Sequence, residues 1–239
     1  MRQRPKGCFL FLIPLFVVAW WGLRTFAAED ERRDLALLLV HALGEEIANL
    51  VLTSGEVSEE SVDVIAEAPG PEKVIAASLP PDRGWIVVVA AVGDGTGEAA
   101  GKAPKLFVSE EMSRISRFDP LQAVADPSHE LRVIEEYDAR TGALSFVRRL
   151  RILKWNGKQL RSVWEGRIWE ESYSPEPPFA RKFTLETRVD IHEDLIETVE
   201  IGCEYERRSD SVQYDPVTET RNTRSFRWDA RTFRFVGAA

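Results

Sequence analysis

Cysteine is almost absent from this chain of 239 residues, which holds only Cys8 and Cys203. Cys8 lies within an apolar N-terminal segment, so the rest of the chain has one thiol and cannot form an internal disulfide. Strand alternation places Cys203 on the same face as Val199, Ile201 and Tyr205. We therefore predict that Cys203 is a buried core thiol rather than a nucleophile.

Histidine is also scarce, with three in the whole chain, and the local motifs of common catalytic sites are missing. The sequence contains no Gly-x-Ser-x-Gly elbow, no His-Glu-x-x-His helix and no phosphate-binding loop. An enzyme would therefore have to assemble its site from dispersed side chains. These absences favour a binding protein and leave a hydrolase with dispersed acidic residues as the alternative.

Only one apolar run approaches the thickness of a membrane, and it covers residues 7–23. Three basic residues precede the run, and small residues follow it. This order is typical of a secretory signal peptide, here residues 1–28. Because about 17 apolar residues also meet the lower limit for a spanning helix, an uncleaved signal anchor is the alternative. In both cases the basic start orients the rest of the chain to the outside.

Basic residues are fewer than acidic ones, with 31 Lys and Arg against 39 Asp and Glu. Residues 1–28 hold four of the basic side chains, so the remainder has 27 against 39 and a formal charge of −12. Phosphate binding requires a basic face, which argues against a nucleic-acid partner. An acidic surface suits an exported protein, periplasmic or extracellular, that meets the membrane only through its N-terminal segment.

Residues 29–239 are sufficient for one domain, which we expect to have a helical start over 29–80 and a β-rich part over 84–237. Leucines and Ile47 recur at helical spacing between residues 29 and 53, which predicts one long helix that stops near Gly55.

Two short helices are also predicted, one over Glu72–Leu79 after Pro71 and one from Asp119-Pro120 to Val124. The continuous apolar run Trp85–Val92 predicts a strand covered on both faces, in a hairpin with Lys105–Val108.

From Leu131 onward the pattern predicts strand after strand. Four turns pair an aromatic residue with Asp or Asn, and they lie at residues 137–142, 155–158, 214–218 and 228–232. A further hairpin turn is expected near residues 192–194.

The stretch Ile152–Val163 also matches Ser225–Val236, with Trp155 over Trp228 and Leu160 over Phe233, as if one hairpin were used twice. The fold class predicted from these patterns is α+β. A long N-terminal helix would pack on a mostly antiparallel sheet, either a sandwich or a partial propeller.

The aromatic-Asn-Gly-Lys and aromatic-Asp-Ala-Arg hairpins resemble those of bacterial exported proteins of the FG-GAP or VCBS type. The resemblance covers about residues 131–237 and implies strand-turn-strand units that build propeller-like sheets. Blades would recur at a regular period, whereas these four turns are irregularly spaced. The calcium loop of that family, a run of alternating aspartates closed by glycine, is missing. Its nearest equivalent is residues 94–98, where Asp94, Thr96 and Glu98 alternate with glycine, and a flexible hairpin tip is the alternative there.

Aromatic side chains provide the best ligand-binding hypothesis, because aromatics on a sheet face can bind sugars or peptides. The candidates are Trp155, Trp164, Trp169, Tyr173 and Trp228. Cross-strand packing is the alternative use of these rings.

A metal site is a second hypothesis, because Asp190, His192 and Asp194 share one face if their strand continues through them. A polar turn at these residues is the alternative.

The sequence thus predicts an exported, non-catalytic, envelope-facing binding or interaction domain. Its partner would be a cell-envelope protein, a peptide or a glycan. No cofactor is predicted, and calcium enters only through the alternative of a calcium-stabilised module. The alternatives are an exported hydrolase with dispersed acidic residues and a calcium-stabilised structural module.

Overall fold

The computed structural model describes residues 31–68, 70–91, 104–139, 144–174, 180–208 and 211–238. The chain divides into two compact units, residues 1–49 and 50–239. The predicted signal segment and the candidate calcium loop at residues 94–98 lie outside the described residues. Within the described residues, no helix is both long enough and apolar enough to cross a membrane.

The predicted long N-terminal helix is broken into two shorter ones. Residues 31–43 are helical, and α2 covers Glu45–Ser54. Between them Gly44 has a φ of +85°, in the left-handed region that other residues rarely adopt. The prediction of one long helix was wrong because the leucine spacing continues through this glycine. The stop near Gly55 is confirmed, and a Cβ on Gly55 would lie only 2.3 Å from the carbonyl oxygen of Ser78.

Four antiparallel strands form the first sheet, in the order β1-β2-β3-β4. Their bounds are β1 Glu56–Val62, β2 Glu72–Leu79, β3 Arg83–Ala90 and β4 Lys105–Val108. The strand predicted over Trp85–Val92 is confirmed as β3, and so is its pairing with Lys105–Val108, which is β4. The predicted helix over Glu72–Leu79 was wrong, and so was a helical start that reaches residue 80. Seven of the eight residues of β2 are buried between β1 and β3, and this burial outweighs the helix propensity of its Ala and Lys residues.

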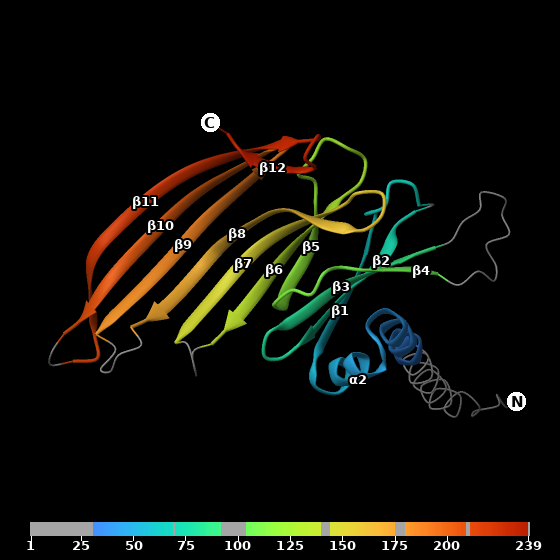
Figure 1. The fold of residues 1–239 in the computed structure, drawn as a ribbon, viewed down its shortest axis with the longest axis horizontal. Helices are drawn as coiled ribbons and strands as arrows, with labels where there is room; N and C mark the ends of the chain where they lie inside the picture. Colours follow the sequence, from blue (N-terminus) through green and yellow to red (C-terminus); the bar gives the residue numbers. More distant parts are fainter. Residues whose placement is uncertain are drawn as a thin grey trace, which may run out of the picture. The chain divides into compact units, whose positions relative to one another are not determined.

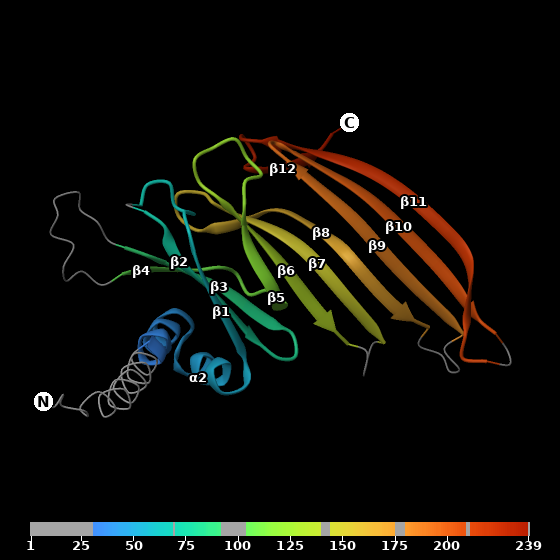
Figure 2. The ribbon, with the colours of Figure 1, turned by 180° about the vertical axis from the view of Figure 1, so that it is seen from behind.

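Eight antiparallel strands form the second sheet, in the order β12-β11-β10-β9-β8-β7-β6-β5. Their bounds are β5 Arg114–Leu121, β6 Glu130–Asp138, β7 Ser145–Trp155, β8 Leu160–Tyr173, β9 Arg181–His192, β10 Leu195–Arg207, β11 Tyr214–Asp229 and β12 Arg234–Gly237. Figure 1 shows β6 to β11 side by side, and Figure 2 shows the same order from behind.

Three of the five predicted turns in this sheet are confirmed, and the turn predicted at residues 137–142 lies partly outside the described residues. Asn156-Gly157 joins β7 to β8, and Gly157 has the positive φ, +88°, that the turn needs. Turns also join β9 to β10 and β11 to β12. Residues 214–218 were wrongly predicted as a turn and lie within β11. The predicted helix from Asp119 was wrong as well, because Asp119 and Pro120 belong to β5, and an edge strand tolerates proline.

Residues of both sheets build one apolar core, which includes Val74, Ala76, Ile86, Val88, Ile115, Phe118, Leu131, Val133 and Leu153. The molecule is therefore mostly antiparallel β-structure in two sheets that share a core. It does not have the α+β architecture with a long helix, and the described strands do not close into a propeller.

Three fully buried glutamates hold irregular segments onto these sheets. Glu72 accepts from the backbone N–H groups of Val64 and Ile65, at 2.7 and 3.1 Å. Glu130 accepts from the N–H of Ala123, at 2.7 Å. The third, Glu135, accepts from the backbone N–H of Ser113, in the segment that precedes β5. Buried carboxylates require such partners, so each glutamate fixes one loop.

Glu135 accepts from the N–H of Ser113 at 3.0 Å. The Nε of Arg151 lies 2.7 Å from Glu135 Oε1 without the alignment of a hydrogen bond, so this contact is an ion pair. Arg151 Nη1 also reaches Glu110 at 2.6 Å. The strand β7 thus supplies a cation to the segment that leads into β5.

Lys154 of β7 provides a second cation, and this one is buried. Its Nζ lies 2.6 Å from Glu130 Oε1 and 2.5 Å from Asp126 Oδ2, and only 3% of the residue is exposed. The same loop reaches a third element, because the N–H of Ala125 donates to Asp194 Oδ1 at 3.3 Å. Lys154 therefore stabilises a loop that connects β5, β6 and the β9–β10 turn.

Replacement of Lys154 by methionine should destabilise the protein strongly. The variant Lys154→Met leaves Glu130 buried without its cation, and loss of one partner of such a pair costs about 3–5 kcal/mol. Urea unfolding measures the change. The exposed Lys158 in the β7–β8 turn is the matched control, and Lys158→Met should change the free energy of unfolding by less than about 0.5 kcal/mol. Equal unfolding midpoints for the two variants would contradict the role of Lys154.

The carboxyl of Asp126 should make stability depend on acid pH. Burial acts to raise the pKa of Asp126, but hydrogen bonds with Lys154 and Ser128 outweigh burial and hold this pKa below its ordinary value of 3.8. A carboxyl with a lower pKa in the folded state stabilises the protein above the unfolded pKa. That contribution is lost as the pH falls from about 4 through the folded pKa.

We therefore expect urea unfolding of the wild type to show a loss of stability as the pH falls below about 4, and Asp126→Asn to lose less over the same range. Parallel loss in both proteins would show that Asp126 makes no such contribution.

Candidate functional site

Strand β8 has a hydrogen-bonded neighbour on only one side over its first half. It pairs with β7 along its whole length, but with β9 only from Trp169 to Tyr173. The register with β7 shifts at Ile168 and again at Val163, which are β-bulges. Because bulges bend a strand and increase its twist, β8 leaves β9 at this point. The strand β12 lies next to the separated part of β8.

The indole of Trp164 fills the space where β8 separates from β9. Trp164 is only 7% exposed, and its ring packs edge-on against Phe226 of β11 with centroids 5.9 Å apart. Its Nε1 is buried and has no hydrogen-bond partner among the residues that the structure describes. A buried indole N–H usually has an acceptor, so this unsatisfied donor is an exception among the described residues.

Gly166 allows the Trp164 ring to take this position. A Cβ at residue 166 would lie 2.7 Å from Cη2 and 3.0 Å from Cζ2 of the ring. Both distances are shorter than ordinary van der Waals contact. The indole therefore lies directly against the β8 backbone, and only glycine leaves enough room.

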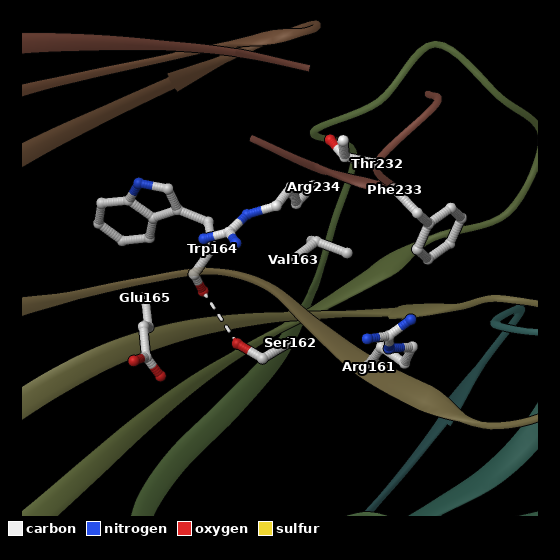
Figure 3. Close-up of a pocket in the computed structure, with 8 residues that line it drawn as sticks. All are labelled: Arg161, Ser162, Val163, Trp164, Glu165, Thr232, Phe233 and Arg234. Atoms are coloured by element: carbon white, nitrogen blue, oxygen red, sulfur yellow. Dashed lines mark hydrogen bonds between the residues drawn. The ribbon is translucent and has the colours of Figure 1, made fainter. Parts of the chain in front are cut away.

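A cavity of about 220 Å³ opens beside Trp164. Residues 161–165 of β8 line one part, and residues 232–234 of the C-terminal hairpin line the other. Figure 3 shows this lining, with Arg161 and Arg234 arising from different strands and the Ser162 hydroxyl bonded to the carbonyl of Trp164. The cavity thus combines two guanidinium groups with an aromatic ring.

The charge of this cavity is positive. Neither Arg161 nor Arg234 forms an ion pair with any residue in the described ranges. Glu165 is the one carboxylate in the lining, and its Oε2 lies 3.4 Å from Nη2 of Arg151. Because Glu165 forms its ion pair with Arg151, Arg161 and Arg234 remain available to an anion.

A second cavity of about 170 Å³ also touches Trp164 and extends toward β9, β10 and β11. Its lining includes Thr187, whose Oγ1 is buried and has no hydrogen-bond partner within the described part of the chain. Glu200 and Arg224 add one charge of each sign, and the Oγ1 of Thr198 bonds the carbonyl of Arg224 at 3.4 Å. This second cavity is polar and close to neutral.

The five aromatic residues predicted to bind ligand do not form one groove. Trp155 packs on Phe107 with centroids 4.6 Å apart, at the core that the two sheets share. Trp228 packs between Phe233 and Phe235. Cross-strand packing, the alternative given above, thus describes Trp228, whereas Trp155 packs between the two sheets and Trp164 lines the cavities.

The remaining two predicted aromatics lie in the half of β8 that pairs with β9. Trp169 is partly exposed opposite Glu186, and Tyr173 faces Lys182. The Tyr173 hydroxyl donates to the Glu171 carboxylate, which raises the pKa of Tyr173 above its ordinary value. Burial acts to lower the pKa of Lys182, but the bond to Glu171 outweighs it and raises this pKa.

The three predicted metal ligands have separate structural contacts. Asp190 pairs with Arg188 at 3.1 Å, and His192 ends β9 opposite Leu195. Asp194 lies in the β9–β10 turn with a φ of +58°, so the strand alternation behind the prediction does not reach it. No group of three His, Cys, Asp or Glu among the described residues could hold a metal ion.

Cys203, predicted to be buried, is only partly so. Its face of β10 also carries Val199, Ile201 and Tyr205, which are partly buried as well. The more buried face of this strand carries Ile196, Thr198 and Gly202 instead. Alternation correctly grouped the four residues, but it did not reveal which face the core covers.

Sequence reasoning missed Arg161 and Arg234, because an exposed strand arginine has no distinctive local pattern. The match between Ile152–Val163 and Ser225–Val236 could have indicated these two residues, because aligning the two stretches places Arg161 over Arg234. The two hairpins differ in register, because Trp155 pairs with Leu160 whereas Trp228 pairs with Phe235.

Comparisons of the chain with protein-family models, with curated proteins and with solved structures gave no match.

The position of the Trp164 ring can be tested through Gly166→Ala. The added methyl group should displace the indole and destabilise the protein by about 1–3 kcal/mol, with a change in near-UV circular dichroism. The matched control is Gly237→Ala, because a Cβ on Gly237 meets no atom within 4 Å.

The same substitution should cost less in a Trp164→Phe background, where the atoms that meet the methyl group are gone. An equal cost in both backgrounds would show that the ring is not the reason for glycine here.

Proposed function

We propose that this protein is an exported, non-catalytic binding domain that takes a small anionic group, a carboxylate or a phosphate, in the cavity beside Trp164. The observation that carries the proposal is the pair Arg161 and Arg234, which have no ion-pair partner among the described residues and line one cavity together with Trp164, whose buried indole N–H has no acceptor there. Export follows from the predicted signal segment at residues 1–28.

The chemistry of the donors supports an anion. A guanidinium presents several N–H groups in a planar fork that matches the oxygens of carboxylates and phosphates. The Trp164 Nε1 adds a neutral donor, which an oxygen of the same ligand would satisfy. All these groups donate and none accepts, so a ligand rich in acceptors is favoured.

The size of the cavity limits what can enter. About 220 Å³ is below the 300–1,000 Å³ that is typical for drug-sized ligands. The cavity therefore suits a small organic acid, or the charged end of a longer molecule such as an acidic peptide or glycan of the cell envelope. Trp164 also lines this cavity, so the charged residues have an aromatic residue beside them.

An exported hydrolase is the second candidate, and one observation favours it. Glu165 and Glu200 both line the second cavity, so two carboxylates face one polar space. General acid and base catalysis often uses such a pair. Glu165 is engaged by Arg151 at 3.4 Å, which favours binding over proton transfer at this residue.

The test of the proposal is titration calorimetry with three probes: glucuronate, inorganic phosphate and glucose. We expect heat of binding with at least one of the two anions and none with glucose. Arg161→Gln and Arg234→Gln should each weaken binding at least about tenfold, since a hydrogen bond to a charged group contributes about 1.5–3 kcal/mol.

The matched control is Arg231→Gln in the same hairpin, where the side chain is 95% exposed and outside the cavity lining. It should leave affinity unchanged. Absence of binding with both anions, or equal loss in the control, would contradict the proposal.

A further inference from the structure

Strand β11 leaves most of its outer edge without a neighbouring strand. β12 pairs only with Phe226–Asp229, so no described strand pairs with residues 214–225 on that side. Residues 216–224 are all exposed. A long open edge presents unpaired backbone groups and is a template for another strand.

Two hydrogen bonds define which backbone groups point outward. The Ser225 carbonyl accepts from the N–H of Ala238 at 2.8 Å, on the β12 side. The N–H of Trp228 donates to the Asp194 carbonyl at 3.0 Å, on the β10 side. Backbone groups alternate in direction along a strand, and the register of β10 with β11 is continuous over residues 218–227. Glu219, Arg221 and Thr223 therefore present both N–H and C=O to the outer edge.

We propose that this edge pairs with the same edge of a second copy, antiparallel about a two-fold axis at Thr220. In this register Glu219 of one protomer lies opposite Arg221 of its partner, and the symmetry repeats the pair. Because both residues point their backbone groups outward, each pair exchanges two N–H to C=O hydrogen bonds. The two eight-stranded sheets would then form one continuous sheet.

The side-chain charges favour a second copy over an unrelated strand. Glu219 and Arg221 lie on the same face of β11, and both are exposed. Within the protomer they lie opposite Cys203 and Ile201 of β10, which carry no matching charge, and neither forms an ion pair with a described residue. A copy of the same edge provides the opposite charge directly across the strand pair.

Neighbouring registers are disfavoured by the same charges. A two-fold axis at residue 219 would place Glu219 opposite itself, and an axis at residue 221 would place Arg221 opposite itself. Pro216 limits the ladder at one end, because proline has no N–H to donate. The pairing is therefore short and closes as a dimer.

The test is sedimentation velocity of the purified protein over a range of concentrations. The wild type should dimerise, and Glu219→Arg or Arg221→Glu should each raise the dissociation constant at least about tenfold, because each puts like charges opposite. The double variant, with both charges exchanged, restores opposite pairs and should restore the dimer.

The control is Glu197→Arg, an exposed charge reversal on β10, which has strands on both sides. It should not change the dissociation constant, and circular dichroism should show that every variant is folded. A monomeric wild type, unaffected single variants or a double variant that stays monomeric would each overturn the proposal.

Discussion

The separation of β8 from β9 is the constraint on which the candidate site depends. The bulges at Val163 and Ile168 bend β8 while its pairing with β7 continues, so the first half of the strand loses a neighbour on the β9 side. The space is filled by a large side chain, Trp164, and the absence of a side chain at Gly166 makes this packing feasible. Cavities remain because one indole does not fill the space completely.

Buried charges hold the elements around this space. Lys154 and Arg151 of β7 ion-pair with fully buried glutamates of β6, and each glutamate also fixes the backbone of a loop. Asp194 carries the same network to the β9–β10 turn, where its carbonyl accepts from the N–H of Trp228. The position of the C-terminal hairpin therefore depends on contacts that begin in the first strands of the sheet. The network thus reaches the end of β11, from which the chain turns back through residues 232–234 beside β8.

Local patterns predicted the hairpins well because their signals are local. Asn156-Gly157 supplies the positive φ of its turn, and the alternation along β9 and β10 is visible in the residues themselves. The errors arose where burial in the folded protein outweighed local propensity. Glu72–Leu79 has the composition of a helix, but it forms a strand because it lies between β1 and β3. Two segments that contain proline were mispredicted, one at Pro120 as a helix and one at Pro216 as a turn. Both lie in strands at an open edge, and the sequence of a segment does not reveal where its strand lies in the sheet.

The candidate site was only partly predictable for the same reason. Trp164 was among the predicted aromatics, but nothing in its local sequence distinguishes it from Trp155, which packs in the core. Arg161 and Arg234 meet through the pairing of distant strands, and only the repeated hairpin connects them in the sequence. A site built from strand positions on both sides of a bulged strand becomes visible only once the sheet is known.

The central claim is that the Trp164 N–H and the two arginines receive an anion, and the indole signals in a proton–nitrogen correlation spectrum test it most directly. Trp164→Phe identifies the Trp164 signal by its loss. Addition of glucuronate or phosphate should move that signal in the wild type and leave it in place when Arg161 and Arg234 are both glutamine. A Trp164 signal that does not respond to either anion, or that still responds without the two arginines, would contradict the account.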